Sequence, residues 1–284
     1  MANKTITATI KHRQATAATW ESKNPVLAAG EFGYDTTNKI TKIGDGTTHW
    51  LDLDTFVTKP KPTFAESDWA TIAEESEKGN AQKYFAVGDE KTIELTTGEE
   101  ITLVILGFNH DDLTGGGKAG ITIGMKELLA TRYRMNASST NAGGWDESEM
   151  RTTTMQTLLG QLPSDLQAAI KSVNKKATSG GASTTIKTSS DKLFLFSKVE
   201  IDGTTSSGYA SEGEQYEYWK TVKDGTVAAD RVKKLSNGGG SADGWWLRSP
   251  NVSSSNSFRY IASTGIVSYD SAHYTCGVSF GFCV

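Results

Sequence analysis

The chain has 284 residues, of which 37% are hydrophobic and 22% are charged, a composition typical of a folded protein with a sizeable core. The net charge of -4 gives no sign of the excess positive charge by which proteins bind nucleic acids or anionic membranes. The N-terminal stretch MANKTITATIKHRQ has no apolar core and no apolar run approaches the length of a membrane span, so we expect cytosolic synthesis without a secretory signal.

Residues 4–57 alternate polar and apolar side chains in short runs such as Thr5–Ile10, interrupted by turn signals such as Gly44–Gly46. This pattern predicts short strands and turns. A segment of this size has little core of its own, so we expect its strands to find partners on other chains. Asp45 and His49 are residue types that bind metals or transfer protons, but their glycine-rich setting favours a role in a turn.

The motif Leu27–Thr36 (LAAGEFGYDT), followed by Lys42–Trp50 (KIGDGTTHW), resembles a module near the start of many phage tail-fibre and baseplate proteins. The resemblance implies an intertwined trimeric β-prism. We therefore expect residues 1–58 to form a phage tail-fibre-like β-module that trimerises the protein and attaches it to the virion.

The proline-rich run Lys59–Pro62 favours extended backbone and predicts a linker over residues 59–66. Residues 67–284 are then the second domain. Apolar periodicity and turn residues predict its elements in chain order. These are a helix over 68–78, a hairpin of strands 91–95 and 100–108, a short helix over 125–134, helices from Asp146 and from Ser164, an exposed loop over 174–190 and a buried strand over 191–197.

The loop Asn109–Asp112 follows a predicted buried strand and holds a histidine and two carboxylates, which are residue types that bind metals. Adjacent residues on a loop seldom point in the same direction. The sequence therefore favours a solvated turn over a metal site, and we predict neither a metal nor another cofactor.

Residues 251–284 contain no Lys, Glu, Gln, Met or Trp, although residues 1–250 contain 57 residues of these five types. No codon that ends in C encodes any of the five, whereas every residue type found in 251–284 has such a codon. One explanation is that a serine-rich region of loops and strands disfavours long polar side chains.

A second explanation comes from a resemblance. Trp245–Pro250 (WWLRSP) and the segment after it resemble the C-terminal variable region of proteins diversified by retroelements, in which a reverse transcriptase randomises adenines of a template copy. The resemblance implies a variable region over about residues 251–276. It implies these ligand-binding variable positions: Val252, Ser253, Ser254, Ser257, Tyr260, Ala262, Ile266, Ser268, Tyr269, Asp270, Ser271, His273, Tyr274 and Cys276. It implies a fixed frame of Phe258, Ile261, Gly265, Ala272, Gly277, Val278 and Phe280.

The order of WDESEMR (145–151), DKLFLFS (191–197) and WWLRSP resembles C-type-lectin-like domains near the formylglycine-generating-enzyme branch. The resemblance covers about residues 80–284. It implies a small twisted antiparallel sheet, flanked by helices, that presents the C-terminal segment as one surface. The predicted fold class is α+β, with a β-prism-type module followed by a C-type-lectin-like ligand-binding domain.

An enzymatic alternative rests on relatives of that fold that oxidise cysteine with a cysteine pair. Here Cys276 falls on a variable position and neither it nor Cys283 has a visible activating group. A nucleophilic set of Asp270, Ser271 and His273 is disfavoured because residues so close along the chain rarely reach the required geometry. We therefore predict that the protein is not an enzyme.

These resemblances together imply the receptor-binding protein of a phage tail fibre. Its expected partners are a bacterial cell-surface receptor, protein or glycan, further copies of itself in a homotrimer, and other phage tail proteins. Neither nucleic acid nor membrane insertion is expected. The protein would reside in the virion tail after synthesis in the host cytoplasm. The alternative is a structural tail or baseplate protein without a ligand of its own.

Overall fold

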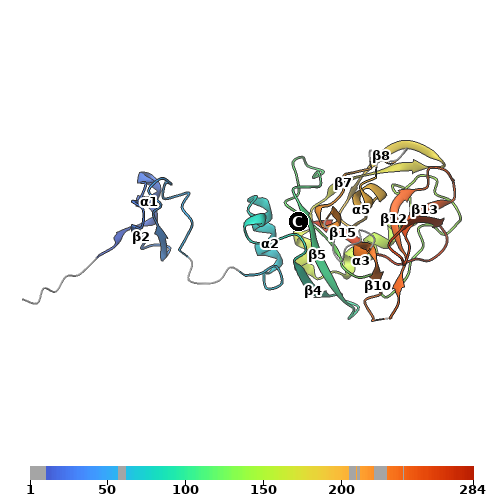
Figure 1. The fold of residues 1–284 in the computed structure, drawn as a ribbon, viewed down its shortest axis with the longest axis horizontal. Coiled ribbons are helices and arrows are strands. Elements are labelled where there is room, and N and C mark those ends of the chain that lie inside the picture. Colours follow the sequence, from blue (N-terminus) through green and yellow to red (C-terminus); the bar gives the residue numbers. More distant parts are fainter. Residues whose placement is uncertain (1–10, 57–61, 205–208, 210–211, 221–228, 239) are drawn as a thin grey trace, which may run out of the picture. The chain divides into compact units, whose positions relative to one another are not determined.

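The computed structural model describes residues 11–56, 62–204, 209, 212–220, 229–238 and 240–284 (Figure 1). The chain divides into two compact units, Met1–Lys61 and Pro62–Val284. The expected strand over residues 5–10 and the part of the expected linker at 59–61 lie outside the described residues.

The first unit is a three-stranded sheet with one helix. Its elements are β1 (Arg13–Ala15), α1 (Ala17–Lys23), β2 (Phe32–Asp35) and β3 (Ile40–Ile43). The strand β2 lies in the middle, parallel to β1 and antiparallel to β3. The helix α1 was not predicted, because its N-cap Thr16 and the single buried residue Trp20 make a weak pattern in a short segment.

Two tryptophans form the centre of this unit. The rings of Trp20 and Trp50 stack at 3.9 Å between centroids and 14° between planes. A Cβ atom on Gly33 of β2 would lie 2.4 Å from the Trp50 ring, so only glycine fits there. Asp45 accepts hydrogen bonds from the Thr48 hydroxyl and from the backbone N–H groups of Thr47 and Thr48, as a turn residue does.

The second unit is built on an antiparallel five-stranded sheet in the order β4-β5-β6-β15-β9. Its strands are β4 (Glu90–Glu94), β5 (Glu100–Phe108), β6 (Ile121–Met125), β9 (Phe194–Leu195) and β15 (Phe280–Cys283). The predicted hairpin of β4 and β5 is confirmed. The last strand of the chain, β15, lies between β6 and the edge strand β9. Since β12 (Trp245–Pro250) is also buried, the C-terminal segment between β12 and β15 (Figure 1) is held at both ends by the core.

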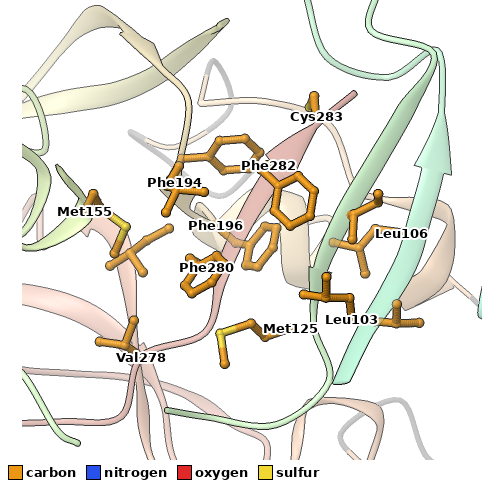
Figure 2. Packing of buried hydrophobic residues seen from close by; sticks show 14 of the residues in the cluster. Leu103, Leu106, Met125, Met155, Phe194, Phe196, Val278, Phe280, Phe282 and Cys283 are labelled. Atoms are coloured by element: carbon orange, nitrogen blue, oxygen red, sulfur yellow. The ribbon is translucent and has the colours of Figure 1, made fainter. Parts of the chain in front are cut away.

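Aromatic side chains fill the core beside this sheet. Phe194, Phe196, Phe280 and Phe282 are fully buried and gather next to Leu103, Leu106 and Met125 (Figure 2). Two glycines, Gly124 of β6 and Gly281 of β15, lie opposite one another in the ladder. A Cβ atom on either would come within 3 Å of the Phe196 ring, so the glycine pair makes room for that ring.

Short helices surround the sheet. They are α2 (Trp69–Glu77), η1 (Ala81–Lys83), the π-helix η2 (Met150–Thr154), α3 (Met155–Gln161), α4 (Ser164–Ala169), α5 (Lys198–Asp202), α6 (Glu217–Lys220) and η3 (Ala229–Arg231). The predicted helix over 68–78 is confirmed as α2, with Asp68 as its cap. The helices predicted from Asp146 and from Ser164 correspond to η2 with α3, and to α4.

Two predictions of local structure are wrong. The stretch 174–190, expected as an exposed loop, forms most of the hairpin of β7 (Val173–Gly180) and β8 (Ser183–Asp191). Beyond β6, the expected helix over 125–134 is irregular, with bends and isolated β-bridges at Leu128 and Tyr133. There the backbone N–H groups of Leu128 and Leu129 donate to the carbonyls of Lys234 and Val278. These partners lie far away in the sequence, so local periodicity does not reveal them.

The remaining strands form two smaller sheets. One has the order β12-β13-β14, from β12 (Trp245–Pro250), β13 (Ser257–Ile261) and β14 (Val267–Ser271). The other pairs β10 (Lys233–Lys234) with β11 (Ala242–Asp243). The architecture is thus α+β, with small sheets and a few helices. No helix among the described residues has the length and apolarity to span a membrane.

Candidate functional site

The C-terminal segment is held by a fully paired hairpin. The strands β13 and β14 match residue for residue from Ser257 opposite Ser271 to Ile261 opposite Val267. On its other side β13 pairs with the buried strand β12, so β14 is the edge strand of this sheet. The hairpin therefore presents its outer strand and the loops around it on a rigid base.

Burial separates the two sets of residues predicted from the sequence. All seven residues of the expected frame are buried. Of the fourteen expected variable positions, only Ser257 is buried, and the other thirteen are exposed or partly exposed. We call these thirteen residues the C-terminal strip. Side chains in the strip can change without disturbing the core, whereas frame residues cannot.

Three large side chains of the strip project into solvent. Ile266, Tyr269 and Tyr274 are 62%, 58% and 53% exposed. The His273 ring packs against Tyr274 at 4.2 Å between centroids. Exposed tyrosines provide large, rigid and amphipathic contact area, as they do in antibody paratopes.

Ser257 does not belong to this surface, because the structure buries it at the start of β13, next to the loop that precedes the strand. Its carbonyl accepts a hydrogen bond of 2.7 Å from the side-chain amide of Asn141. The same amide donates to the carbonyl of Ser254 at 2.8 Å, and the Asn141 backbone N–H donates to the carbonyl of Ser255. Asn141 therefore fixes this loop. Sequence reasoning missed it, because a single asparagine in a Ser/Asn/Gly loop carries no signal.

Arg259 and Tyr209 also adjoin the strip and were not predicted. Arg259 of β13 donates from Nε to the Tyr209 hydroxyl at 2.9 Å, and its guanidinium carbon lies 5.3 Å from the Tyr209 ring and 5.5 Å from the Tyr269 ring. The Tyr209 hydroxyl also accepts a hydrogen bond from the backbone of Val252. The arginine thus lies within cation–π distance of two tyrosines, one buried and one exposed.

A buried ionic network anchors the base of the hairpin. Arg248 of β12 donates to both carboxylate oxygens of Glu200, at 2.5 and 2.7 Å. Its other N–H groups donate to the backbone carbonyls of Lys176, Leu195 and Glu212. Burial alone would raise the pKa of Glu200, but the charges of Arg248 and Lys175 hold it below its usual value. Arg248 is thus a structural anchor with all its donors used.

Lys175 extends this network to Asp111. The Lys175 ammonium lies 2.6 Å from both Asp111 and Glu200, and Tyr216 donates to Asp111. The loop Asn109–Asp112 was predicted as a solvated turn, and for Asp111 this is wrong, because the residue is only 5% exposed and pairs with Lys175. Among the described residues, no group of three or more His, Cys, Asp or Glu residues is placed to hold a metal ion.

Glu212 is a buried acid of this region whose carboxylate, unlike those of Asp111 and Glu200, forms no ion pair with a described residue. Its carboxylate accepts hydrogen bonds from the Ser249 hydroxyl and from the Thr178 backbone N–H. Burial nevertheless raises the pKa of Glu212 to about 7. The backbone N–H of Glu212 donates to the carbonyl of Tyr209, so the network also supports the tyrosine beside Arg259.

Neither the two cysteines nor the pair of Ser271 and His273 is arranged as an activated nucleophile. Burial raises the pKa of the Cys276 thiol to about 12 and that of Cys283 well above its usual value. The Ser271 hydroxyl lies 2.9 Å from His273 Nδ1, while Asp270 accepts from the Ser271 backbone. In this fully described segment, no hydrogen bond or ion pair joins Asp270 to His273, so the structure brings together two members of the set and not the third.

Each of the two units contains a region that matches a known protein family. Residues 10–48 match the family model described as the major tropism determinant N-terminal domain. No curated protein matches the chain. Among solved structures, the chain is similar to a full-length streptococcal bacteriophage hyaluronidase in complex with unsaturated hyaluronan octasaccharides, at 24% identity and a TM-score of 0.18. That match covers 19% of this chain and spans only 15% of the hyaluronidase chain, which is too little to describe the fold.

A second family model covers most of the larger unit. It begins at residue 120, just before β6, and ends at residue 284, so it includes Lys175, Glu200 and Arg248 of the buried ionic network, but not Asp111, and the whole C-terminal strip. Because residues 120–284 make up more than half of the chain, the protein belongs to the family described as domain of unknown function DUF6273.

Proposed function

We propose that this protein is the receptor-binding protein of a phage tail fibre and that its C-terminal strip binds a ligand on the bacterial surface. The observation that carries the proposal is the division of residues 251–280 by burial. The expected frame is buried, and all expected variable positions except Ser257 are accessible. A surface of this kind can be rebuilt for new ligands while the fold is kept.

The N-terminal unit supports the same function. Its match to a tropism-determinant domain agrees with a role in choosing the host. In the proposal, this unit forms a trimeric β-prism that joins the protein to other tail proteins of the virion. Three copies of the strip would then act together, so each copy needs only modest affinity.

In the same proposal, the second unit is a C-type-lectin-like domain diversified by a retroelement. The composition of residues 251–284, with no Lys, Glu, Gln, Met or Trp, supports diversification through codons ending in C. The protein would act by binding and not by catalysis, without a cofactor. The raised pKa values of the Cys276 and Cys283 thiols support this, because the reactive form of cysteine is the thiolate.

A binding experiment tests the proposal. Fluorescently labelled protein is incubated with a panel of bacterial strains, and the variant Tyr269→Ala/Tyr274→Ala is compared with the wild type on every strain that binds. We expect the double variant to lose cell binding by tenfold or more, since exposed aromatic anchors dominate such interfaces. Its melting temperature should stay nearly unchanged, because both rings are more than half exposed.

A matched control is Leu51→Ala, which removes a side chain of similar exposure, 50%, from the first unit. This variant should bind cells as the wild type does. If the double tyrosine variant binds every strain as well as the wild type, the strip is not the binding surface. The structural tail protein would then be the better interpretation.

A further inference from the structure

Arg259 differs from the other arginines of the described chain. Five of them form ion pairs with a carboxylate, namely Arg13, Arg132, Arg134, Arg151 and Arg248. Arg231 lacks such a pair but is only 8% exposed. Arg259 is partly exposed, and no carboxylate among the described residues lies within ion-pair distance of it.

Its donors are only partly used. Nε donates to the Tyr209 hydroxyl, and Nη2 donates to Asn251 Oδ1 over 3.3 Å. Among the described residues Nη1 has no hydrogen-bond partner. The edge formed by Nη1 and Nη2 therefore retains N–H groups in the parallel arrangement that carboxylates and phosphates accept.

The position of this edge is fixed before any ligand arrives. Two tyrosine rings lie close to the guanidinium, that of Tyr209, which is 2% exposed, and that of Tyr269, which is 58% exposed. Tyr209 is in turn held by the backbone N–H of Glu212, whose side chain belongs to the buried network. A preorganised charge loses little conformational entropy on binding, which favours affinity.

The surroundings of Arg259 favour a saccharide over a protein segment. The strip beside it is rich in hydroxyl groups and carries only one large aliphatic side chain that is mostly exposed, Ile266. Protein interfaces, by contrast, usually bury an apolar core and are depleted in serine. Serine hydroxyls can exchange hydrogen bonds with sugar hydroxyls, and the free face of Tyr269 can stack on a sugar ring.

From these observations we propose that Arg259 is a fixed anion-binding residue beside the C-terminal strip and that the ligand is an acidic bacterial polysaccharide. The anionic group, a uronate carboxylate or a phosphate, accepts hydrogen bonds from the Nη1/Nη2 edge while the adjoining sugar ring stacks on Tyr269. This rests on the proposed function, since it assigns the chemistry of the ligand that the strip binds.

The test uses the full chain and two sets of immobilised polymers. One set is uronate-containing bacterial polysaccharides, each compared with its carboxyl-reduced form. The other is glycerol-phosphate polymers, each compared with its dephosphorylated backbone. The proteins are the wild type, Arg259→Gln, Arg259→Lys and the matched control Arg13→Gln, which removes an exposed arginine from the first unit.

We expect the wild type to bind an acidic polymer and to bind its neutral form 10- to 100-fold more weakly, the range expected for hydrogen bonds to a charged group. Arg259→Gln should bind the acidic polymer more weakly than the wild type by the same factor. Arg259→Lys should retain part of the affinity, and Arg13→Gln should bind as tightly as the wild type. The set that shows this pattern identifies the anion as carboxylate or phosphate. A melting temperature of Arg259→Gln close to the wild-type value confirms that the fold is intact.

The inference is overturned if the wild type binds only neutral polymers, if it binds no polymer of either set, or if Arg259→Gln binds acidic polymers as tightly as the wild type. It is also overturned if binding is abolished when the cells are treated with proteinase, and the proteinase is removed, before the protein is added, because the ligand is then a protein. In each of these cases, a loss of cell binding in Tyr269→Ala/Tyr274→Ala still supports the proposed function, whereas unchanged cell binding in that variant contradicts the function itself.

Discussion

Arg248 and Glu200 form a two-pronged ion pair at the base of the C-terminal hairpin, with both side chains enclosed by the core. The arginine comes from the WWLRSP run that leads into the C-terminal hairpin, and the glutamate comes from α5. A buried pair of this kind adds little net stability compared with apolar residues, but breaking it leaves an uncompensated charge. The pair therefore determines where the hairpin starts and tolerates little change.

Replacing Arg248 with lysine should lower the free energy of unfolding by about 3–5 kcal/mol, because lysine cannot satisfy Glu200 and the three carbonyls together. Urea denaturation followed by circular dichroism measures the change. The control is Arg134→Lys, since Arg134 is 48% exposed where it pairs with Glu149, and such a pair contributes at most about 1 kcal/mol. Equal effects of the two substitutions would contradict the anchoring role of Arg248.

The glycine pair in the central sheet gives a prediction about packing. In Gly281→Ala the added methyl would lie 2.6 Å from the Phe196 ring and 2.9 Å from the Phe194 ring. We expect destabilisation of about 1–3 kcal/mol from overpacking. Gly160→Ala on α3 is the control, because no atom lies within 4 Å of its Cβ position and alanine favours a helix by up to about 1 kcal/mol. Destabilisation by the control, or none by Gly281→Ala, would contradict this packing.

Glu212 makes stability depend on pH. Its folded-state pKa of about 7 lies above the usual 4.5, so the folded protein binds a proton more tightly than the unfolded chain between these values. Its contribution is therefore most favourable below pH 4.5 and is lost as the pH rises through 7, a change of about 3 kcal/mol. Glu212→Gln, which stays neutral, should gain stability relative to the wild type between pH 5 and pH 8. A constant difference across that range would show that Glu212 is not buried as described.

The cysteines provide a test of the non-enzymatic interpretation. With a pKa of about 12, the Cys276 thiol has about a thousandfold less thiolate near pH 8 than an ordinary cysteine with a pKa of 9.0. Iodoacetamide should therefore label native protein very slowly and unfolded protein readily, as mass spectrometry would reveal. Rapid labelling of native Cys276 or Cys283 would indicate an activated thiol and would favour the oxidase alternative.

Sequence reasoning succeeded where the pattern is local. The β4–β5 hairpin and α2 follow from apolar periodicity and turn residues that lie within a few positions of one another. The expected frame was identified by resemblance, and its burial agrees with that role. Whether the other positions vary stays a prediction.

Sequence reasoning failed where partners are distant. Lys175 lies in a stretch rich in Lys, Thr, Ser and Gly, yet it is buried because Asp111, 64 residues away in the chain, and Glu200 neutralise it. Arg259 was overlooked for a similar reason, since its partner Tyr209 is 50 residues away. A single sequence does not show such pairings, and charged residues are then assigned to the surface by default.

The nucleotide sequence of the 3′ end of this gene and of the DNA that follows it would show whether the C-terminal strip is diversified. We expect a near-identical template copy beside a reverse-transcriptase gene, with adenine differences under the accessible positions of the C-terminal strip and none under the seven buried frame residues. The absence of a template, together with codons for Tyr260, Ser268 or His273 that do not end in C, would contradict diversification. Template adenines under Phe258, Ile261 or Phe280 would contradict the separation of binding from folding.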